Sequence, residues 1–396
     1  MAEADPGRLA PPINVCFPFA GGMVGGSHIS ACQLIKSLDP AHYRPLVVVH
    51  QRGGQFEELL ADEKIAFEVA PAAVHFGRMS GLWQSKGIGD HARAAMAVPG
   101  LARFLKQRQV DIVHTNEGAM HITWALPARM AGAKLLWHHR SSPEARGLRH
   151  LAPHFADKVV GVSAFALSHF NRKPRRVTAS VVYSPFDTDI AVDRSAMRAK
   201  LLAELGLPET TTIVGYFGNF VARKRPLLFV DVIAELAARA PERTCVGLMF
   251  GGVIDQGLDA EVVERAAVLG VSSKVKLMGF RRPGADWLAA CDTLAVTAVG
   301  EPFGRTLIEA MLLETAVVAV DTGGNSEAIR HGETGLLARV DDAGAIAESI
   351  LQLADHPEQR ARIVAAARQD ALDRYGRTRH RQGVEAAYRE LLPCRS

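Results

Sequence analysis

The chain has no long hydrophobic run. Among its 396 residues, no stretch reaches the roughly eighteen consecutive apolar residues that a transmembrane helix needs. The opening segment MAEADPGRLAPP contains acidic residues and has no apolar core, which is not typical of a secretory signal. The sequence therefore predicts neither membrane insertion nor export, and we expect a cytoplasmic protein.

Cysteine is scarce as well. The five cysteines are odd in number and widely spaced, and most of them stand in apolar, strand-like contexts. This pattern indicates reduced structural thiols and argues against a disulfide framework or a metal cluster. The residues concerned are Cys16, Cys32, Cys245, Cys291 and Cys394.

The overall composition is that of a soluble globular protein, with 48% hydrophobic and 22% charged residues. The length predicts two domains. Residues 1–190 hold 21 basic and 15 acidic residues, whereas residues 191–396 have a net charge of −2. A basic first half suits contact with an anionic membrane surface or an acidic acceptor. Basic and aromatic residues are not interleaved and no nucleic-acid motif occurs, so no nucleic-acid partner is expected.

Short apolar runs alternate with amphipathic helical patterns along the whole chain. This alternation predicts an α/β protein whose parallel sheets are covered by helices on both faces. Turn signals at Ser184-Pro185 and Leu207-Pro208 place the domain boundary near residues 186–208. The expected strands are INVCFPF, RPLVVVH, AFEVA, DIVHTN, KLLWHH and DKVVGVS in the first half, and TTIVGYFGNF, TCVGLMFGG, KVKLMGF, DTLAVTAV and AVVAVD in the second.

Two carboxylates stand at a predicted junction between a loop and a helix. Glu301 follows an apolar run, and Glu309 lies one turn inside the helix that opens after Gly304. A helix N-terminus carries unpaired N–H groups and partial positive charge, and helical side chains lean toward it. We therefore expect both carboxylates to flank a phosphate-binding site. There they could accept hydrogen bonds from the hydroxyls of a ribose and a sugar. The alternative is a solvated loop acid followed by a favourable first-turn charge.

The residues around this pair resemble glycosyltransferase family 4, the retaining group 1 nucleotide-sugar transferases of the GT-B fold. The segment EPFGRTLIEAM matches the family pattern E-x-F-G-x-x-x-x-E-A-M, and AVVAVDTGGNSEAI and HGETGLL follow it. The resemblance implies two Rossmann-like, doubly wound parallel-sheet domains that face a central cleft. Residues 1–190 would form the acceptor-side domain and residues 191–377 the donor-binding domain, with the helix 378–396 packing back on the first.

The resemblance also implies roles for residues of the second half. Glu309 would hold the ribose hydroxyls, Glu301 would bind the sugar hydroxyls, and Lys224 would neutralise the leaving diphosphate. Backbone amides at the helix start would face the diphosphate, and the loop near residue 280 would receive the nucleobase. The remaining donor-binding candidates are Gly218, Asn219, Arg223, Phe280, Arg281, Phe303, Gly304, Arg305 and Thr306.

The cationic segment departs from the family pattern G-R-x-x-x-x-K-G. Gly218 and Lys224 fit it, but Asn219 replaces the family arginine and Arg225 replaces the last glycine. Either Arg223 or Arg225 restores the missing cation, or the diphosphate is held more loosely. A solvated turn without a ligand role is the alternative for the whole run.

A glycine-rich loop, PFAGGMVGGSHIS, follows the first predicted strand and contains Gly21, Gly22, Gly25 and Gly26. It is a degraded dinucleotide fingerprint, and the second strand lacks the acidic residue that would hold an adenosine ribose, which disfavours NAD. The resemblance implies that the loop borders the donor phosphates and the acceptor. A tight strand-to-helix turn is the alternative.

The fifth predicted strand ends in His138 and His139, at the end where ligands of open α/β sheets gather. Strand side chains alternate, so the two imidazoles point in opposite directions. The resemblance implies that His139 lies near the transferred sugar and stabilises developing charge. A histidine with a purely structural role is the alternative.

The segment Asp187-Thr188-Asp189 imitates a D-x-D metal signature but stands in the predicted linker, so we expect no essential metal and no cofactor besides the nucleotide-sugar co-substrate. The sequence thus predicts a retaining transferase that moves a sugar from a nucleotide-diphosphate sugar to a glycan, lipid-linked or small-molecule acceptor. The expected setting is polysaccharide biosynthesis, in the cytoplasm or peripherally at the inner membrane face. A nucleotide-sugar 2-epimerase and a non-catalytic nucleotide-sugar-binding protein are the alternatives.

Overall fold

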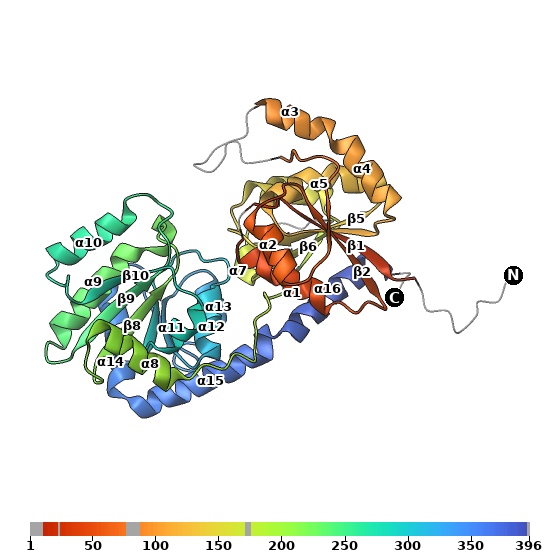
Figure 1. The fold of residues 1–396 in the computed structure, drawn as a ribbon. Coiled ribbons are helices and arrows are strands. Elements are labelled where there is room, and N and C mark those ends of the chain that lie inside the picture. The colour runs from red at the N-terminus through yellow and green to blue at the C-terminus, as the bar shows by residue number, and fades with distance from the viewer. Residues whose placement is uncertain (1–10, 23, 77–87, 171–175, 394–396) are drawn as a thin grey trace. The chain divides into compact units, whose positions relative to one another are not determined.

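The computed structural model describes residues 11–22, 24–76, 88–170 and 176–393, which form two compact units (Figure 1). Unit 1 runs to Pro185 and resumes at Arg377, and unit 2 runs from Phe186 to Gly376. The first unit thus ends at Pro185, a few residues before the predicted boundary at residue 190. No helix of the described residues has the length and apolar character needed to cross a membrane.

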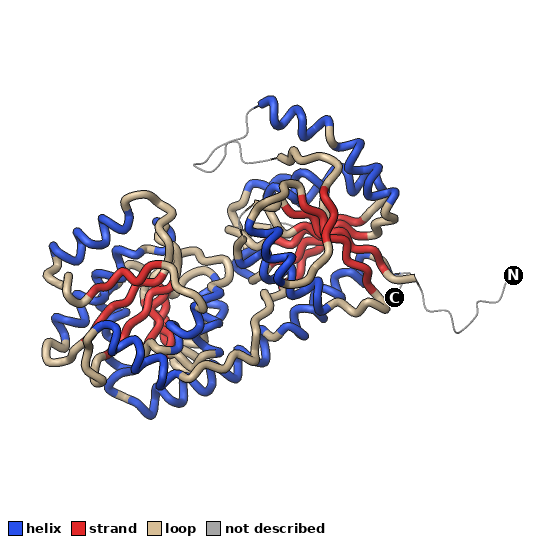
Figure 2. The backbone as a smooth tube through the Cα atoms, viewed as in Figure 1, coloured by secondary structure: helices blue, strands red, loops and turns tan. Residues whose placement is uncertain are grey.

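Unit 1 is built on a seven-stranded sheet in the order β3-β2-β1-β4-β5-β6-β7, and all its strand pairs are parallel. The central strands are almost continuously buried, as expected for parallel strands that helices cover on both faces (Figure 2). The strands are β1 (Ile13–Phe19), β2 (Tyr43–Val49), β3 (Phe67–Val69), β4 (Ile112–Thr115), β5 (Lys134–His139), β6 (Lys158–Gly161) and β7 (Thr178–Val181).

The last helix of the chain, α16 (Arg377–Leu391), packs within unit 1. Its buried Val384 and Tyr388 belong to the same apolar cluster as Phe17 and Leu34. Tyr388 also forms a hydrogen bond of 2.6 Å with His114 Nδ1 on β4. The other helical elements of unit 1 are α1 (Gly26–Ser37), α2 (Gln55–Asp62), α3 (Ile88–Met96), α4 (Val98–Gln107), α5 (Gly118–Ala131), η1 (Gly147–Leu151), α6 (Ala152–Phe155) and α7 (Ala164–Leu167).

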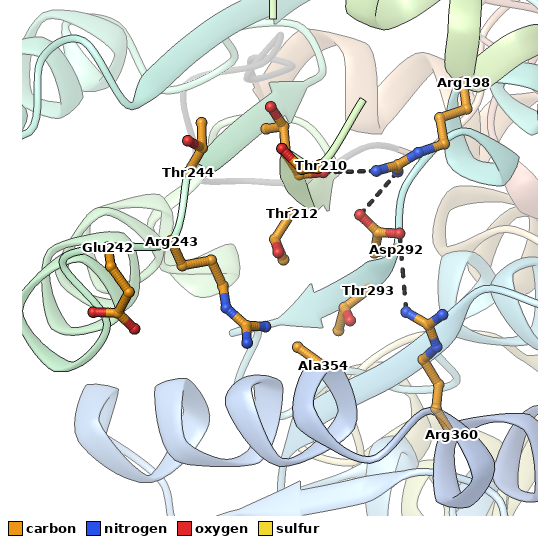
Figure 3. A pocket seen from close by; sticks show the side chains of 11 residues that line it. Arg198, Thr210, Thr212, Glu242, Arg243, Thr244, Asp292, Thr293, Ala354 and Arg360 are labelled. Atoms are coloured by element: carbon orange, nitrogen blue, oxygen red, sulfur yellow. Dashed lines mark hydrogen bonds and ion pairs between the residues drawn. The ribbon is translucent and has the colours of Figure 1, made fainter. Parts of the chain in front are cut away.

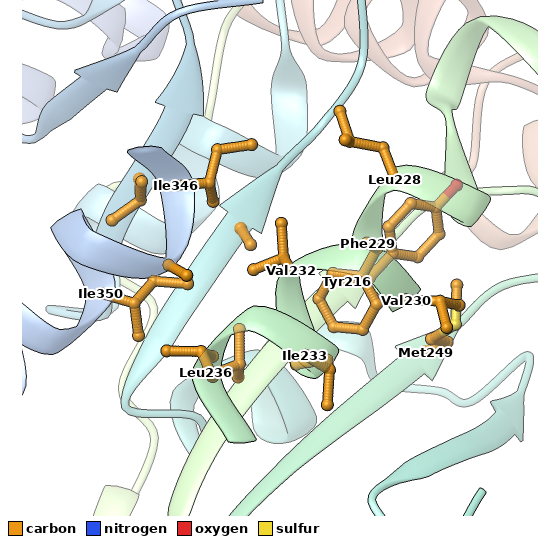
Figure 4. Close-up of a cluster of buried hydrophobic side chains, with 14 of the residues drawn as sticks. Tyr216, Leu228, Phe229, Val230, Val232, Ile233, Leu236, Met249, Ile346 and Ile350 are labelled. Carbon is orange, nitrogen blue, oxygen red and sulfur yellow. The ribbon is translucent and has the colours of Figure 1, made fainter. Parts of the chain in front are cut away.

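Unit 2 contains a six-stranded parallel sheet in the order β10-β9-β8-β11-β12-β13. Helices α9 (Pro226–Arg239) and α14 (Ala343–Asp355) bury apolar side chains such as Phe229, Ile233 and Ile350 against it (Figure 4). The strands are β8 (Thr212–Phe217), β9 (Cys245–Phe250), β10 (Val275–Gly279), β11 (Thr293–Val296), β12 (Ala316–Val320) and β13 (Leu336–Ala338). The other helical elements are α8 (Arg194–Leu205), η2 (Ala222–Lys224), α10 (Leu258–Val268), α11 (Gly284–Ala289), α12 (Arg305–Leu312), α13 (Gly324–Ala328) and α15 (Pro357–Tyr375).

The predicted fold class, an α/β protein with two parallel sheets, is confirmed. One edge strand in each sheet, β7 and β13, is absent from the predicted strands. β7 is mostly exposed or half-buried, and β13 has only three residues, so neither produces an extended apolar run. Edge strands of this kind give little of the signal on which strand prediction depends.

The four cysteines in the described part of the chain are buried free thiols. Burial raises the pKa of Cys32 to about 12 and raises the pKa of Cys16 further. Thiols with such pKa values are almost never thiolates at neutral pH and are poor nucleophiles. Cys394 lies outside the described residues.

Candidate functional site

The predicted loop-to-helix junction is present in unit 2. The chain leaves β11, passes Glu301, and enters α12 at Arg305, with Gly304 as the residue before the helix. Gly304 has φ = 72°, a left-handed conformation that glycine adopts without steric cost. The helix buries Leu307, Ile308 and Met311, so its N-terminus is fixed at the carboxyl end of the sheet.

Glu301 lies between two cations. Its Oε2 accepts hydrogen bonds from Arg223 Nη1 at 2.5 Å and from Lys224 Nζ at 3.0 Å, and its side chain is 14% exposed. Burial alone would raise the pKa of Glu301, but the charges and hydrogen bonds of Lys224 and Arg223 hold it below its ordinary value. These three side chains form what we call the Glu301 cluster, which has a net charge of +1.

Glu309 has the opposite environment. Burial raises its pKa, and the charges of Arg305 and Lys224 only partly offset that effect. Arg305 Nη2 lies 3.7 Å from Glu309 Oε1, one helical turn away. The Arg305 guanidinium also stacks over the ring of Phe186 at 4.3 Å from its centroid. The pKa values of Glu301 and Glu309 are therefore shifted in opposite directions.

A cavity of about 20 Å³ joins these elements. Its lining includes Lys224 from η2, Glu301 from the loop, and Gly304 and Thr306 from the start of α12. This volume is close to that of a single water probe, so a larger ligand has to lie over the cavity. The structure thus brings together four residues that the sequence analysis assigned to one site.

Close glycine contacts hold the Glu301 loop. Gly324 N–H donates a hydrogen bond of 2.7 Å to the carbonyl oxygen of Glu301. A Cβ on Gly324 would lie 2.9 Å from that oxygen and 3.0 Å from Phe303 Cα, so no larger side chain fits without movement. On the other side of the cluster, a Cβ on Gly218 would meet the Lys224 side chain at 3.3 Å. The Gly323-Gly324 turn and Gly218 therefore position the cluster through backbone proximity.

Asn325 belongs to the segment AVVAVDTGGNSEAI but is not among the predicted donor-binding residues. It is fully buried, and its Nδ2 donates to the carbonyl oxygens of Ala298 and Val320 at 3.3 and 3.1 Å. Its Oδ1 has no hydrogen-bond partner among the described residues and lies 3.4 Å from the position of a Cβ on Gly304. The amide ties the site loop to the ends of two strands. In the sequence, Asn325 stands directly after a buried strand and two glycines, and this position could have identified it as a site residue.

The two candidate replacements for the family arginine lie apart. Arg223 contacts Glu301, whereas Arg225 pairs with Asp341 and has a left-handed backbone conformation with φ = 52°. Asn219 Oδ1 accepts a hydrogen bond of 3.2 Å from Gly252 N–H and so joins the loops after β8 and β9. Of the two arginines, Arg223 is the one in the Glu301 cluster.

Three predicted donor-binding side chains have other packing partners. Phe303 is 7% exposed, and its ring centroid lies 5.9 Å from that of Phe186 and 5.7 Å from that of Tyr375. Arg281 pairs with Glu204 at 2.5 Å and stacks over Trp287 at 4.4 Å. Phe280 is 67% exposed beside the Arg282 guanidinium. Ligand contacts at Phe303, Phe280 and Arg281 remain predictions.

In unit 1 the glycine loop packs against the loop that follows β2. Gly21 has φ = 97°, and a Cβ there would lie 2.1 Å from the Gln51 carbonyl oxygen. Gly25 precedes α1, which begins at Gly26, and its N–H donates to His28 Nδ1 at 3.0 Å. At Gly22, no described residue has an atom within 4 Å of a Cβ position. Gly21 is thus needed for packing, while Gly22 leaves open space beside the backbone.

Glu117 is a second residue that the sequence analysis did not select. It follows β4 and precedes α5, and its carboxylate pairs with His28 Nε2 through Oε1. Its Oε2 accepts a hydrogen bond of 2.9 Å from Ala20 N–H. The glycine loop is therefore fixed by a carboxylate from the neighbouring strand. An acidic residue at the carboxyl end of a buried strand was the available signal.

His139 is 3% exposed and is hydrogen bonded through Nε2 to the Ser142 carbonyl oxygen at 2.9 Å. Burial lowers its pKa, so the ring is neutral near pH 7. His138 has different hydrogen-bond partners. Its Nδ1 lies 3.0 Å from His114 Nε2 and 3.3 Å from Arg140 Nη2. The alternation of the two rings agrees with strand geometry, and the role of His139 remains a prediction.

A larger pocket, of about 490 Å³, lies at the amino ends of β8 and β11 (Figure 3). Asp292 is paired there with Arg198 at 2.9 Å and with Arg360 at 4.0 Å, and Arg243 pairs with Asp355. These pairs set two aspartates against three arginines, and Glu242 also lines the pocket. The net positive charge of unit 2's candidate site is at the opposite, carboxyl end of the sheet.

The described residues contain no group of three or more His, Cys, Asp or Glu side chains arranged to hold a metal ion. Within the DTD segment, Asp189 N–H donates to Asp187 Oδ1 at 3.2 Å, which is a local turn contact. The expectation that no metal is essential remains a prediction.

Comparison with known proteins places this site within a family pattern. Residues 197–370 match the family model of glycosyl transferases group 1. The matched segment contains the whole Glu301 cluster and Glu309. The solved structures that resemble the chain include glycosyltransferases of the GT-B type, and the chain has this fold.

Among individual relatives, D-inositol 3-phosphate glycosyltransferase of Rhodococcus jostii is 34% identical over 204 residues, which is 50% of this chain and 44% of that protein. The protein of the same name from Salinispora arenicola is 29% identical over 365 residues, 85% of this chain and 75% of that protein. The alignment with the Rhodococcus jostii protein thus spans under half of that protein's length.

Two solved structures cover nearly the entire chain. Anabaena Alr3699/HepE in complex with UDP and glucose matches 96% of this chain and 100% of that chain, with a TM-score of 0.79 and 24% identity. A glycosyltransferase from Rickettsia africae matches 97% of this chain and 99% of that chain, with a TM-score of 0.80 and 20% identity. At these identities the likeness establishes the fold.

Proposed function

We propose that the protein transfers a sugar from a nucleoside-diphosphate sugar to an acceptor, with retention of the anomeric configuration. The observation that carries this proposal is the Glu301 cluster, in which Arg223 and Lys224 meet a carboxylate beside the N-terminus of α12. A diphosphate requires fixed positive charge, and a helix N-terminus and two cations supply it. The match of residues 197–370 to the group 1 family model supports the same activity.

The donor would lie over the small cavity at the start of α12. Its diphosphate competes with Glu301 for Lys224 and Arg223, and the amides of Gly304, Arg305 and Thr306 receive phosphate oxygens. Glu301, released from its cations, accepts hydrogen bonds from hydroxyls of the transferred sugar. Glu309 accepts hydrogen bonds from the ribose hydroxyls.

In the chemical step, the bond between the anomeric carbon and the diphosphate oxygen breaks. The acceptor oxygen attacks from the same face, and its proton passes to an oxygen of the leaving phosphate. Lys224 stabilises the negative charge that develops on the diphosphate. His139 in unit 1 is proposed to support the oxocarbenium-like state. No metal enters this scheme.

UDP-glucose is the first donor to examine, because Anabaena Alr3699/HepE has been crystallised with it. The acceptor is a glycan, a lipid-linked molecule or a small molecule. D-inositol 3-phosphate is a candidate through the names of the relatives from Rhodococcus and Salinispora. We place the protein in the cytoplasm, with peripheral contact to an anionic membrane face.

The experiment is a thermal-shift screen of the full chain against UDP-, GDP- and ADP-linked sugars. A donor at a hundred times its Kd stabilises the fold by about 2.7 kcal/mol, which a melting curve resolves. The responding donor is then incubated with host extract or D-inositol 3-phosphate, and mass spectrometry and NMR identify the product and its anomeric configuration. An absence of response to every donor overturns the proposal, and so does conversion of the donor to its 2-epimer without transfer.

A further inference from the structure

Unit 1 contains an apolar pocket that the proposed donor chemistry does not use. It has a volume of about 440 Å³ and is lined by residues of α3, α4, α5, η1 and α6. The large apolar side chains that line it include Val98, Ile122, Leu126, Leu151 and Phe155. A pocket of this size accepts a substantial part of a small ligand or a lipid chain.

The polar side chains of the lining are already engaged by the protein. His121 Nδ1 is hydrogen bonded to Thr115 Oγ1 at 2.7 Å, and its ring stacks on Trp137 with centroids 4.1 Å apart. Thr123 Oγ1 donates to the Ala119 carbonyl oxygen at 2.8 Å and accepts from Phe76 N–H at 3.0 Å. A polar ligand would therefore find few groups to bind, and an apolar ligand suits the pocket.

An exposed apolar stripe runs from the pocket along α5. Ile122, Leu126 and Met130 follow one another at intervals of four residues and are 38%, 45% and 46% exposed. Met96 at the end of α3 is 80% exposed. Adjacent exposed apolar residues beside an apolar pocket mark a surface that contacts a partner or a membrane.

The same elements are strongly basic. Their sequences contain five Lys or Arg residues and a single acid, Asp90, which gives them a net charge of +4, as large as that of the whole chain. Two of these cations are exposed and lie close in sequence to the apolar residues, Arg129 next to Met130 and Arg149 two residues before Leu151. The five cations are Arg93, Arg103, Lys106, Arg129 and Arg149.

We propose that this α3–α6 surface binds an anionic lipid of a membrane, whose apolar chain enters the pocket while the surrounding cations face the phosphate headgroups. The combination of an apolar pocket, an exposed apolar stripe and a one-signed charge fits an anionic amphiphile better than a protein or a polar metabolite. This surface belongs to unit 1 alone, and its function does not depend on the donor chemistry of unit 2.

The test is co-sedimentation of the full chain with vesicles of phosphatidylcholine, alone or mixed with phosphatidylglycerol. We expect a higher partition coefficient on the anionic vesicles and a decrease of that coefficient with salt. Leu126→Glu removes an apolar contact and is expected to lower the coefficient about tenfold. Replacing Arg129 and Arg149 together with glutamine is expected to lower it by about tenfold or more on anionic vesicles only.

Val69→Glu is the matched control, because Val69 is also 45% exposed and lies in unit 1 but outside the α3–α6 surface. It is expected to bind vesicles like the wild type. The thermal shift with a nucleotide sugar should be the same in Leu126→Glu and wild type, which separates this surface from the donor site and reports on folding.

Equal partitioning of Leu126→Glu and Val69→Glu would overturn the proposal, as would equal binding to neutral and anionic vesicles. Two further outcomes identify other occupants and also overturn it. Displacement by inorganic phosphate alone would indicate a phosphate site without chain insertion. A wild-type dimer in sedimentation velocity that Leu126→Glu dissociates would indicate that a second copy covers the surface.

Discussion

Both units place glycine-containing loops at the carboxyl ends of their central strands, but the loops carry charge differently. In unit 2, Glu301 faces two cations and the cluster retains a net positive charge. In unit 1, the Glu117 carboxylate is matched by His28 and by the backbone of Ala20. A site with surplus positive charge suits an anionic ligand, whereas a carboxylate that accepts hydrogen bonds from two neighbouring loop groups holds a loop in place. We therefore expect the loops of unit 2 to bind the ligand, and the Glu117 contact in unit 1 to hold the glycine loop in position.

The largest effect is expected from Lys224→Met. Loss of the cation that stabilises the leaving diphosphate should reduce turnover by about 10²- to 10³-fold. Arg225→Met is the matched control, because Arg225 is its neighbour but pairs with Asp341. Steady-state kinetics with the donor found in the screen measure both. An equal loss in the two variants would show that the cluster is not the donor's charge partner.

Gly324→Ala tests whether backbone proximity holds the Glu301 loop. The added Cβ would lie 2.9 Å from the Glu301 carbonyl oxygen, and the shift needed should cost about 1–3 kcal/mol of unfolding free energy and weaken donor binding. Gly284→Ala is the control, since a Cβ there has nothing within 4 Å. Denaturant unfolding and donor titration compare the two. Identical behaviour would contradict the importance of the contact.

Glu309→Gln should weaken donor binding by about tenfold, because a charged acceptor of the ribose hydroxyls becomes neutral. Burial raises the pKa of Glu309, so on acidification the wild-type affinity should begin to fall at a higher pH than it would with an ordinary glutamate. The affinity of the Glu309→Gln variant should not fall on acidification in this way. Since the folded-state pKa is raised, Glu309 favours folding below its ordinary pKa and this contribution is lost as the pH rises.

A matched control for this measurement is Glu314→Gln, just beyond the end of the same helix, where the side chain is 53% exposed. Donor affinity measured by calorimetry across pH should be that of the wild type in this variant. If the donor affinity of Glu309→Gln still falls at low pH as in the wild type, a group other than Glu309 causes the pH dependence.

The smallest effect is expected from Glu117→Gln in unit 1. The amide oxygen can still accept the hydrogen bond from Ala20, but the hydrogen bond between His28 Nε2 and the charged carboxylate is weakened, so unfolding should become easier by about 1 kcal/mol. Exposed Glu144→Gln serves as the control. Donor affinity should not change in either variant. A changed donor Kd in Glu117→Gln would remove the distinction between the two units.

The sequence was sufficient for most of the fold, because buried parallel strands produce long apolar runs such as INVCFPF and AVVAVD. It was also sufficient to select Glu301 and Lys224, which stand in dense motifs. It could not identify contacts that join distant parts of the chain. Ala20 and Glu117 are 97 residues apart, and their hydrogen bond depends on the neighbouring positions of β1 and β4.

The choice between Arg223 and Arg225 illustrates another limit. The two residues are close in sequence and chemically identical, so residue type cannot separate them. The left-handed conformation at Arg225 redirects the chain, and its guanidinium reaches Asp341 while Arg223 reaches Glu301. Local backbone conformation of this kind depends on tertiary context, because a non-glycine residue rarely adopts it by itself.

The close glycine contacts have a consequence for altering the protein by mutagenesis. A Cβ on Gly54 would lie 2.1 Å from the Gly21 carbonyl oxygen, and one on Gly251 would lie 2.1 Å from the Gly218 carbonyl oxygen. Saturation libraries at these positions should therefore return almost only glycine, whatever activity is selected. Gly22, whose Cβ position has no other described residue within 4 Å, is a position of the loop after β1 where a library should introduce new side chains without displacing the backbone.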